Sequence, residues 1–207
     1  IVFNGEIYNF LELRKTLDAQ SKEKWVGNSD TEVLLAALSN WGIKTTLSRL
    51  NGMFAFALWD KEENVLTLAR DRFGEKPLYY FESGGNFAFS SQLSSLEVFP
   101  LVDKTINRHA VSRFLNCGYF SAHETIYTSV KKLLPAHYLQ WQPIKGIIKE
   151  EAYWNIEEIV NTSQRNIINI SDDEATERLD ILLKDAVSKR MLSDVPLGAF
   201  LSGGVDS

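Results

Sequence analysis

The residues best suited to chemistry stand near the two ends of the chain, and those at the C-terminal end form the more specific pattern. Residues 201–207 read Leu-Ser-Gly-Gly-Val-Asp-Ser and continue an apolar run at 196–201 that predicts a short buried strand. Glycines let a backbone turn tightly and bring its N–H groups against an anion, and serine hydroxyls add donors. The pattern therefore favours a phosphate-binding loop. Phosphate would repel Asp206, so this residue favours a magnesium ion as the bridge.

Two alternatives bear on this loop. It differs from the P-loop of many nucleotide-binding proteins, because no Gly-Lys-Ser/Thr sequence ends it. A strand, a tight turn and a helix cap would also explain a lone Ser-Gly-Gly sequence. The complete string behind an apolar strand favours phosphate binding over this structural interpretation.

The N-terminal group consists of Asn4, Gly5 and Glu6, with Asp30 further along the chain. The side-chain amide of Asn4 and the backbone N–H of Gly5 are two donors that can form an oxyanion hole for acyl transfer. The two carboxylates can hold an ammonium group. Taken alone, however, Asn-Gly predicts a turn and Asp30 a helix cap, and on that evidence the structural interpretation is the stronger one.

Antiparallel hairpins and short helices must position these groups. The expected elements are a strand at 1–3 ended by a turn at Asn4-Gly5, helices at 7–17, 29–42 and 110–115, and hairpins at 53–69, 78–90 and 138–154. The second helix is expected to end at Gly42. This mixture predicts an α+β layered domain over 1–154.

The remainder of the chain predicts a linker and the start of another domain. Residues 155–171 are polar and weakly patterned, which is typical of a linker. A long amphipathic helix then begins at 171–174 and runs to about Met191. Its expected inner face consists of Leu179, Leu182, Leu183, Ala186 and Val187. The second domain is therefore predicted over 172–207.

Composition excludes several classes of protein. The chain has 207 residues and a formal net charge of -5 with no basic run, which argues against a nucleic-acid partner. Its longest apolar runs are strand-sized, so no membrane span is expected. The single cysteine rules out an internal disulfide and fits a reducing compartment, which favours a soluble, cytoplasmic protein. Because the chain starts within an apolar strand and stops within a loop, we expect a truncated piece.

Five motifs occur in one order along the chain. They are NGEIYN at 4–9, SDTEV at 29–33, GMFAFA at 52–57, RDRFGEKPLYY at 70–80 and SGGVDS at 202–207. Together they resemble asparagine synthetase of the glutamine-hydrolysing type over essentially the whole chain. The last motif by itself resembles the pyrophosphate-binding loop of ATP pyrophosphatases.

The resemblance implies a four-layer α/β/β/α sandwich of the N-terminal-nucleophile hydrolase type, here truncated. The first helix and strand of an α/β ATP pyrophosphatase-type domain would follow it. In that family an N-terminal cysteine attacks the glutamine amide, with its own amino group as the base. Asn4 and Gly5 match the oxyanion donors of the family. Glu6 and Asp30 match residues that bind the backbone groups of glutamine.

The resemblance also implies an ATP-dependent second half. Ammonia would pass to a site where ATP adenylates aspartate, and ammonia would displace AMP to give asparagine and pyrophosphate. The matching positions are Ser202, Gly203, Gly204 and Ser207 for pyrophosphate, Asp206 for Mg²⁺, and Phe200 for ATP through its backbone.

Several positions depart from the family or carry no assigned role. The nucleophile and a glutamine-binding arginine would precede Ile1, and Cys117 has no free amine beside it, so we interpret it as a small core residue. Residues 1–207 alone are therefore expected neither to hydrolyse glutamine nor to make asparagine. Residues 70–72 (Arg-Asp-Arg) are interpreted as a structural ion-pair network at a domain interface. Gln92 stands where the family has Glu.

Other functions remain open. A relative with the same two domains could amidate another carboxylate, a further relative closes β-lactam rings, and a third possibility is a non-catalytic binding domain. The acceptor and the oligomeric state, a homodimer among the options, cannot be read from these residues.

Overall fold

The computed structural model describes residues 1–20, 24–121, 123–191 and 195–204. Contacts along the chain divide it into two compact units, Ile1–Val160 and Asn161–Ser207. Each unit is described by itself.

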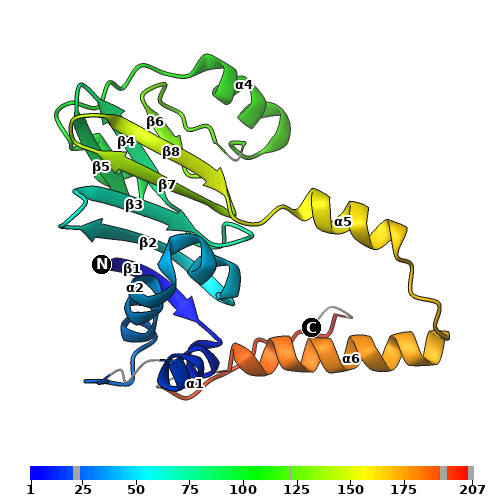
Figure 1. The fold of residues 1–207 in the computed structure, drawn as a ribbon. Helices are drawn as coiled ribbons and strands as arrows, with labels where there is room; N and C mark the ends of the chain where they lie inside the picture. Colours follow the sequence, from blue (N-terminus) through cyan, green and yellow to red (C-terminus); the bar gives the residue numbers. More distant parts are fainter. Residues whose placement is uncertain (21–23, 122, 192–194, 205–207) are drawn as a thin grey trace. The chain divides into compact units, whose positions relative to one another are not determined.

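Two antiparallel sheets form the centre of the first unit (Figure 1). The larger sheet has the order β1-β2-β3-β7-β8, with β1 (Val2–Ile7), β2 (Gly52–Asp60), β3 (Val65–Arg70), β7 (His137–Gln142) and β8 (Gly146–Ala152). The smaller sheet has the order β5-β4-β6, with β4 (Tyr79–Ser83), β5 (Asn86–Ser90) and β6 (Val130–Lys132). The three predicted hairpins are confirmed as β2–β3, β4–β5 and β7–β8.

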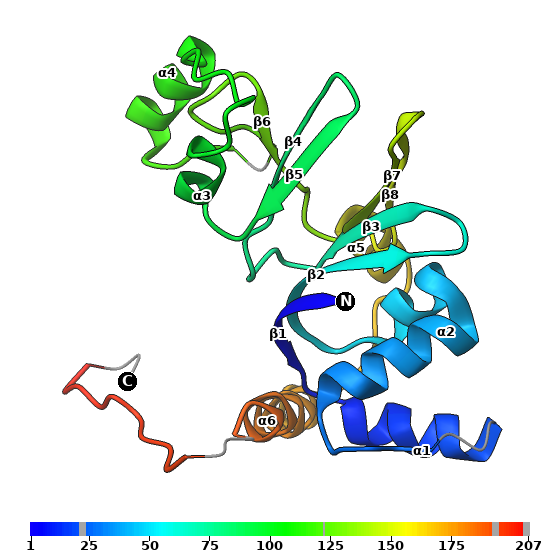
Figure 2. The same cartoon turned by 90° about the vertical axis from the view of Figure 1, so that its left-hand side faces the viewer.

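Helices cover the outer faces of both sheets (Figure 2). They are α1 (Phe10–Gln20), α2 (Asp30–Arg49), α3 (Leu93–Glu97) and α4 (Arg108–Cys117), and α5 (Ile156–Arg165) follows β8. One buried cluster joins α1 and α2 to the larger sheet, and a second lies between the sheets. A third joins α3 to the smaller sheet.

Strand β2 shows how the sequence builds these layers. Phe54 and Phe56 pack in the helix-side cluster, whereas Ala55 and Ala57 pack between the sheets. Alternate side chains of a strand point to opposite faces, so the continuous apolar run of β2 fills two layers at once. The order helix, sheet, sheet, helix confirms the predicted α/β/β/α sandwich.

The predicted turn at Asn4-Gly5 is wrong, because β1 continues through both residues to Ile7. A Cβ added at Gly5 would lie 2.1 Å from the carbonyl oxygen of Met53. Gly5 is therefore required by the close approach of β2 rather than by a turn. The following helix begins at Phe10 instead of residue 7, since Ile7 is the buried last residue of β1.

Gly42 interrupts α2, as predicted, but the helical backbone resumes and continues to Arg49. The φ of Gly42 is 72°, in the left-handed region, so the helix bends there. The buried hydroxyl of Thr46 donates to the carbonyl of Ala37 at 2.9 Å and joins the two halves across the bend.

Two segments after residue 154 differ from the prediction in their secondary structure. Residues 155–171, predicted as a polar linker with little pattern, contain α5, and their role as a linker stays a prediction. Residues 196–201 form no strand, because among the described residues of their unit no other strand supplies ladder hydrogen bonds.

Helix α6 (Asp172–Lys189) is confirmed, and the side chain of its N-cap Ser171 accepts from the N–H of Glu174. Its apolar stripe, however, does not form an inner face. Leu179, Leu182, Leu183 and Val187 are all more than half exposed. An amphipathic stripe needs an opposing surface, and none of the residues of α6 is buried.

Among the described residues, no helix is both long and apolar enough to cross a membrane.

Candidate functional site

The hydrogen bonds of Phe54 determine where Gly5 presents its N–H group. The Phe54 N–H donates to Asp71 Oδ2 at 3.3 Å, and the Phe54 carbonyl accepts from the Asp71 N–H at 2.8 Å. Both backbone groups of a strand residue point to the same side, so Phe54 faces away from β1. Gly5 lies opposite Phe54, and their pair is therefore not hydrogen-bonded. Since β1 is the outermost strand of the sheet that residues 1–207 form, the Gly5 N–H points to the open edge of that sheet.

Strand residues two apart direct their N–H groups to the same side, so Ile7 points its N–H to the same edge as Gly5. Asp30 lies there and accepts it. The Ile7 N–H also points away from β2 and donates to Asp30 Oδ2 at 2.9 Å. Asp30 is the first residue of α2, and the side chain of its N-cap Ser29 accepts from the N–H of Glu32 at 3.2 Å. The start of α2 thus holds the Asp30 carboxylate along the edge that carries the Gly5 N–H.

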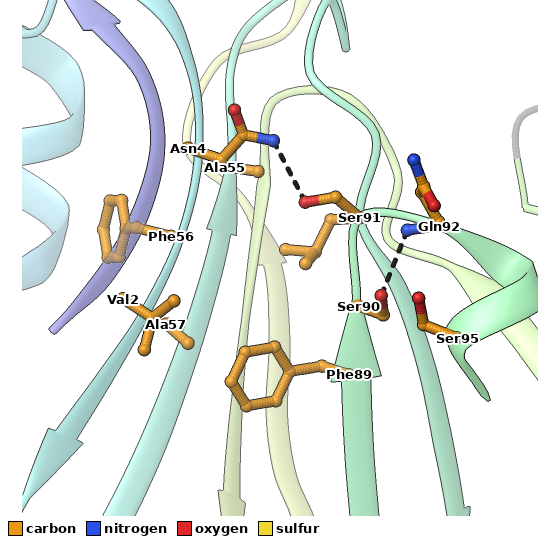
Figure 3. Close-up of a pocket in the computed structure, with 11 residues that line it drawn as sticks. Val2, Asn4, Ala55, Phe56, Ala57, Phe89, Ser90, Ser91, Gln92 and Ser95 are labelled. Atoms are coloured by element: carbon orange, nitrogen blue, oxygen red, sulfur yellow. Dashed lines mark hydrogen bonds between the residues drawn. The ribbon is translucent and has the colours of Figure 1, made fainter. Parts of the chain in front are cut away.

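Asn4 and Glu6 extend from the face of β1 opposite to the buried Ile7 and are exposed. The Asn4 side chain lies at the wall of a cavity of about 390 Å³ between β1, β2 and β5 (Figure 3). Its Nδ2 donates to the hydroxyl of Ser91 at 3.0 Å. The fold therefore brings all four N-terminal candidates to one strand edge: Asn4, Gly5 and Glu6 on β1, and Asp30 against its end.

This edge has the donors and charges for an amide substrate with an ammonium group. An Asn4 amide N–H and the Gly5 N–H are neutral donors of the kind that stabilise an oxyanion. The carboxylates of Glu6 and Asp30 are acceptors for a cation. Sequence inspection missed Ser91, because 87 residues separate it from Asn4 and only the packing of the two sheets joins them.

The ion-pair network predicted for residues 70–72 is wrong. Among the described residues, no ion pair includes these side chains, and their charges bind backbone groups instead. The Arg70 guanidinium donates to the carbonyls of Gly74, Lys76 and Leu133, each at 2.7 Å. The buried Asp71 carboxylate accepts backbone N–H groups of Phe54, Phe73, Glu75 and Lys76. The loop after β3 has few backbone partners of its own, so these two side chains supply them.

Cys117 is also placed differently from the prediction. It is exposed at the C-terminal end of α4, rather than packed in a core. Among the residues of α4 only Ala110 is buried.

The C-terminal loop is exposed and is described only to Gly204. The Ser202 hydroxyl accepts from the Gly204 N–H at 3.3 Å, so a phosphate would have to replace this contact to use that donor. A Cβ at Gly203 would meet no atom within 4 Å, which leaves its backbone open to an anion. Phe200 is fully exposed. The predicted magnesium ligand Asp206 and the predicted phosphate ligand Ser207 lie outside the described residues, and within those described no cluster of three metal-ligating side chains occurs.

Family models match both parts of the chain, and the longer match covers the residues of the two sheets. A family model described as a glutamine amidotransferase domain matches residues 1–154. The chain belongs to the glutamine amidotransferase domain family. A second model, described as asparagine synthase, matches residues 178–207 of this amidotransferase chain.

Two curated relatives and one solved structure agree with this assignment. Asparagine synthetase (glutamine-hydrolyzing) 3 of Bacillus subtilis is 36% identical over 208 residues, covering 100% of this chain and 32% of the relative. A putative asparagine synthetase (glutamine-hydrolyzing) 2 of Methanocaldococcus jannaschii is 35% identical over 209 residues, covering 100% of this chain and 38% of the relative. The resemblance inferred from the motifs is thus confirmed. The amidotransferase chain spans about a third of the length of these relatives.

The solved structure is a glutamine phosphoribosylpyrophosphate amidotransferase from B. subtilis, determined with ADP and GMP. It matches with a TM-score of 0.52 at 22% identity, covering 73% of this chain and 28% of that one. This likeness confirms the N-terminal-nucleophile type of fold.

Proposed function

We propose that this chain is part of an ATP-dependent ligase that releases ammonia from glutamine and uses it to amidate aspartate to asparagine. The observation that carries the proposal is the convergence of the Gly5 N–H, the Asn4 amide and the Asp30 carboxylate at the open edge of β1. The names of the two curated relatives support the choice of reaction.

In the glutamine half, the residues of this chain bind and polarise rather than attack. Asn4 Nδ2 and the Gly5 N–H donate to the oxygen of the side-chain amide of glutamine as it becomes an oxyanion. Glu6 and Asp30 hold the α-ammonium group of glutamine. The attack itself belongs, by family resemblance, to an N-terminal cysteine. Cys117 lies inside the chain with no free amine beside it, so it does not supply that attack.

In the ATP half, the C-terminal loop holds the pyrophosphate portion of ATP. Ser202, Gly203, Gly204 and Ser207 would donate to phosphate oxygens, Asp206 would hold the accompanying Mg²⁺, and Phe200 would contact ATP through its backbone. ATP supplies the leaving group that makes the aspartate carboxylate reactive. We assign residues 1–154 to the glutamine half, 155–171 to a connection and 172–207 to the ATP half. The single cysteine fits a cytoplasmic enzyme.

The test is a product assay on the complete gene product that contains residues 1–207. With glutamine, ATP, Mg²⁺ and aspartate, we expect glutamate, AMP, pyrophosphate and asparagine in equal amounts. Glutamate release without asparagine would overturn aspartate as the acceptor and favour a relative that amidates another carboxylate. Absence of glutamate would overturn the glutamine half and favour a ring-closing or binding relative.

A further inference from the structure

The hydrogen bond between Asn4 and Ser91 connects the glutamine site to the second sheet. Asn4 belongs to β1 of the larger sheet, and Ser91 directly follows β5 of the smaller one. Figure 3 shows the Asn4 amide nitrogen directed at the Ser91 hydroxyl across the top of the cavity, and the two atoms lie 3.0 Å apart. No motif in the sequence connects these two residues, which are 87 positions apart.

Ser91 is held in place from both sides. Before it, Ser90 pairs with Tyr79 in the β4–β5 ladder. After it, the Gln92 N–H donates to the Ser90 hydroxyl at 3.1 Å, and α3 begins at Leu93. Leu96 of α3 is buried against the smaller sheet and fixes the helix there. The Ser91 hydroxyl therefore stands at a set position relative to β1.

The orientation of the Asn4 amide matters because its two ends have opposite polarity. The nitrogen carries two N–H donors, and the oxygen is an acceptor that would repel an oxyanion. The terminal torsion of asparagine is broad, so an unheld amide samples both orientations. A hydroxyl that accepts one N–H fixes the nitrogen side and leaves the second N–H for the substrate.

We propose that Ser91 is a positioning residue for glutamine hydrolysis, which accepts one Nδ2 hydrogen of Asn4 and so directs the other at the oxyanion. This inference rests on the proposed role of Asn4. Ser91 itself does not touch the reacting atoms, and its effect is exerted only through Asn4.

The experiment measures glutamate release by the complete gene product. Ser91→Ala should lower kcat by about 10-fold with KM changed less than about twofold, since an orienting hydrogen bond is lost while glutamine still binds. Ser91→Thr keeps the hydroxyl and should restore most of the rate. Ser95→Ala makes the same chemical change on the wall of the same cavity and should leave the rate unchanged.

A double-mutant cycle separates positioning from a structural role. In an Asn4→Ala background, Ser91→Ala should have no further effect, because the group that it orients is gone. An equal 10-fold loss in both backgrounds would overturn the inference, and so would an unaffected Ser91→Ala enzyme.

The side-chain amide spectrum of ¹⁵N-labelled residues 1–207 tests the contact without any turnover. Ser91→Ala should shift one of the two Asn4 Nδ2 protons strongly, and Ser95→Ala should not. If the contact is seen but the gene product releases no glutamate, the proposed function fails and Ser91 has no reaction to serve. If glutamate is released but the amide resonances do not respond, this inference alone fails.

Discussion

At the scale of single residues, the strand edge depends on Gly5 having no side chain. The backbone of β2 occupies the position that a Cβ would need, since Met53 O would lie 2.1 Å and Phe54 Cα 2.7 Å away. Backbone atoms inside a sheet cannot move aside independently. The Asn4-Gly5 sequence predicts a turn, whereas the glycine is needed because β2 lies too close for a Cβ. The sequence alone does not distinguish these two requirements for glycine.

We therefore expect Gly5→Ala to lower the free energy of unfolding by about 3 kcal/mol, as overpacking in a tight region does. Urea denaturation followed by circular dichroism measures the change. Gly27→Ala is the control, because its Cβ would find only the Glu32 carboxylate, at 3.6 Å. A Gly5→Ala protein as stable as the Gly27→Ala protein would contradict the close approach of the two strands.

Asp71 binds Phe54, the β2 residue opposite Gly5, from the far side of β2. Its carboxylate is buried and accepts four backbone N–H groups, including that of Phe54. Asp71→Asn replaces one acceptor oxygen by a donor that faces other donors, and should destabilise the protein by roughly 2–3 kcal/mol. Equilibrium unfolding measures the loss.

Asp60→Asn is the matched control for this change. The Asp60 carboxylate accepts the N–H groups of Glu62 and Glu63 in an exposed turn, where water can replace the lost contacts. We expect less than about 1 kcal/mol from that substitution. Equal losses from the two variants would contradict the importance of burial at Asp71.

At the scale of elements, the start of α2 fixes the segment that carries Asp30. Ser29 accepts the Glu32 N–H, and the Glu32 carboxylate accepts the N–H groups of Val26 and Gly27 at 2.7 and 2.9 Å. These two backbone donors lower the pKa of Glu32 below its usual 4.5. This arrangement is an extended form of a helix-capping box.

A lowered carboxylate pKa predicts the sign of the pH dependence. The charged form of Glu32 stabilises the folded state above pH 4.5, and this contribution disappears as the pH falls through the lowered value. Glu32→Gln should therefore melt at a lower temperature than the unsubstituted chain at pH 7, and the two should converge in strong acid. Thermal melts at several pH values measure this, with the exposed Glu62→Gln as a control for the change in charge. A difference that persists at low pH would contradict the role of the charged carboxylate.

The elements that are predicted correctly from the sequence are those whose apolar residues repeat at clear strand or helix spacing. The three hairpins, α4 and α6 all have apolar residues at strand or helix spacing, and local chemistry sets their ends. Elements α3 and β6 are missed because they are short. Helix α5 is missed because the prediction for residues 155–171 rests on their polar composition, although Ile156, Ile159 and Val160 stand at helical spacing. The strand predicted at 196–201 fails for the opposite reason: its apolar pattern is clear, but a strand exists only with a partner.

In the candidate site too, residues within a motif are predicted from the sequence, whereas residues that contact them from distant positions are not. Asn4, Gly5, Glu6 and Asp30 are predicted as site residues from their motifs, and the fold brings them to one strand edge. Ser91 and Asp71 act on that edge from the second sheet and from the end of β3, through hydrogen bonds that no local pattern contains.

At the scale of the whole molecule, the buried clusters formed by the described residues lie in the first unit. All three buried clusters draw their residues from between Phe3 and Tyr153. None of the residues of α6 is buried. No residue of the second unit takes part in these three clusters.

We expect a protein consisting of residues 1–160 to keep the melting temperature of residues 1–207 within about 2 °C, which is smaller than the shift caused by a 1 kcal/mol loss in a domain of this size. Differential scanning calorimetry of both proteins measures it. A lower melting temperature for the shorter protein would show that residues 161–207 stabilise the sandwich.

We propose that the open edge of β1 binds glutamine and serves only the release of ammonia. The most direct measurement compares asparagine formation by the Asn4→Ala gene product with glutamine and with ammonia as the nitrogen source. We predict that the glutamine-dependent rate falls by about 10²–10³-fold, as loss of an oxyanion donor requires, while the ammonia-dependent rate is unchanged. Equal loss of both rates, or loss of neither, would contradict the claim.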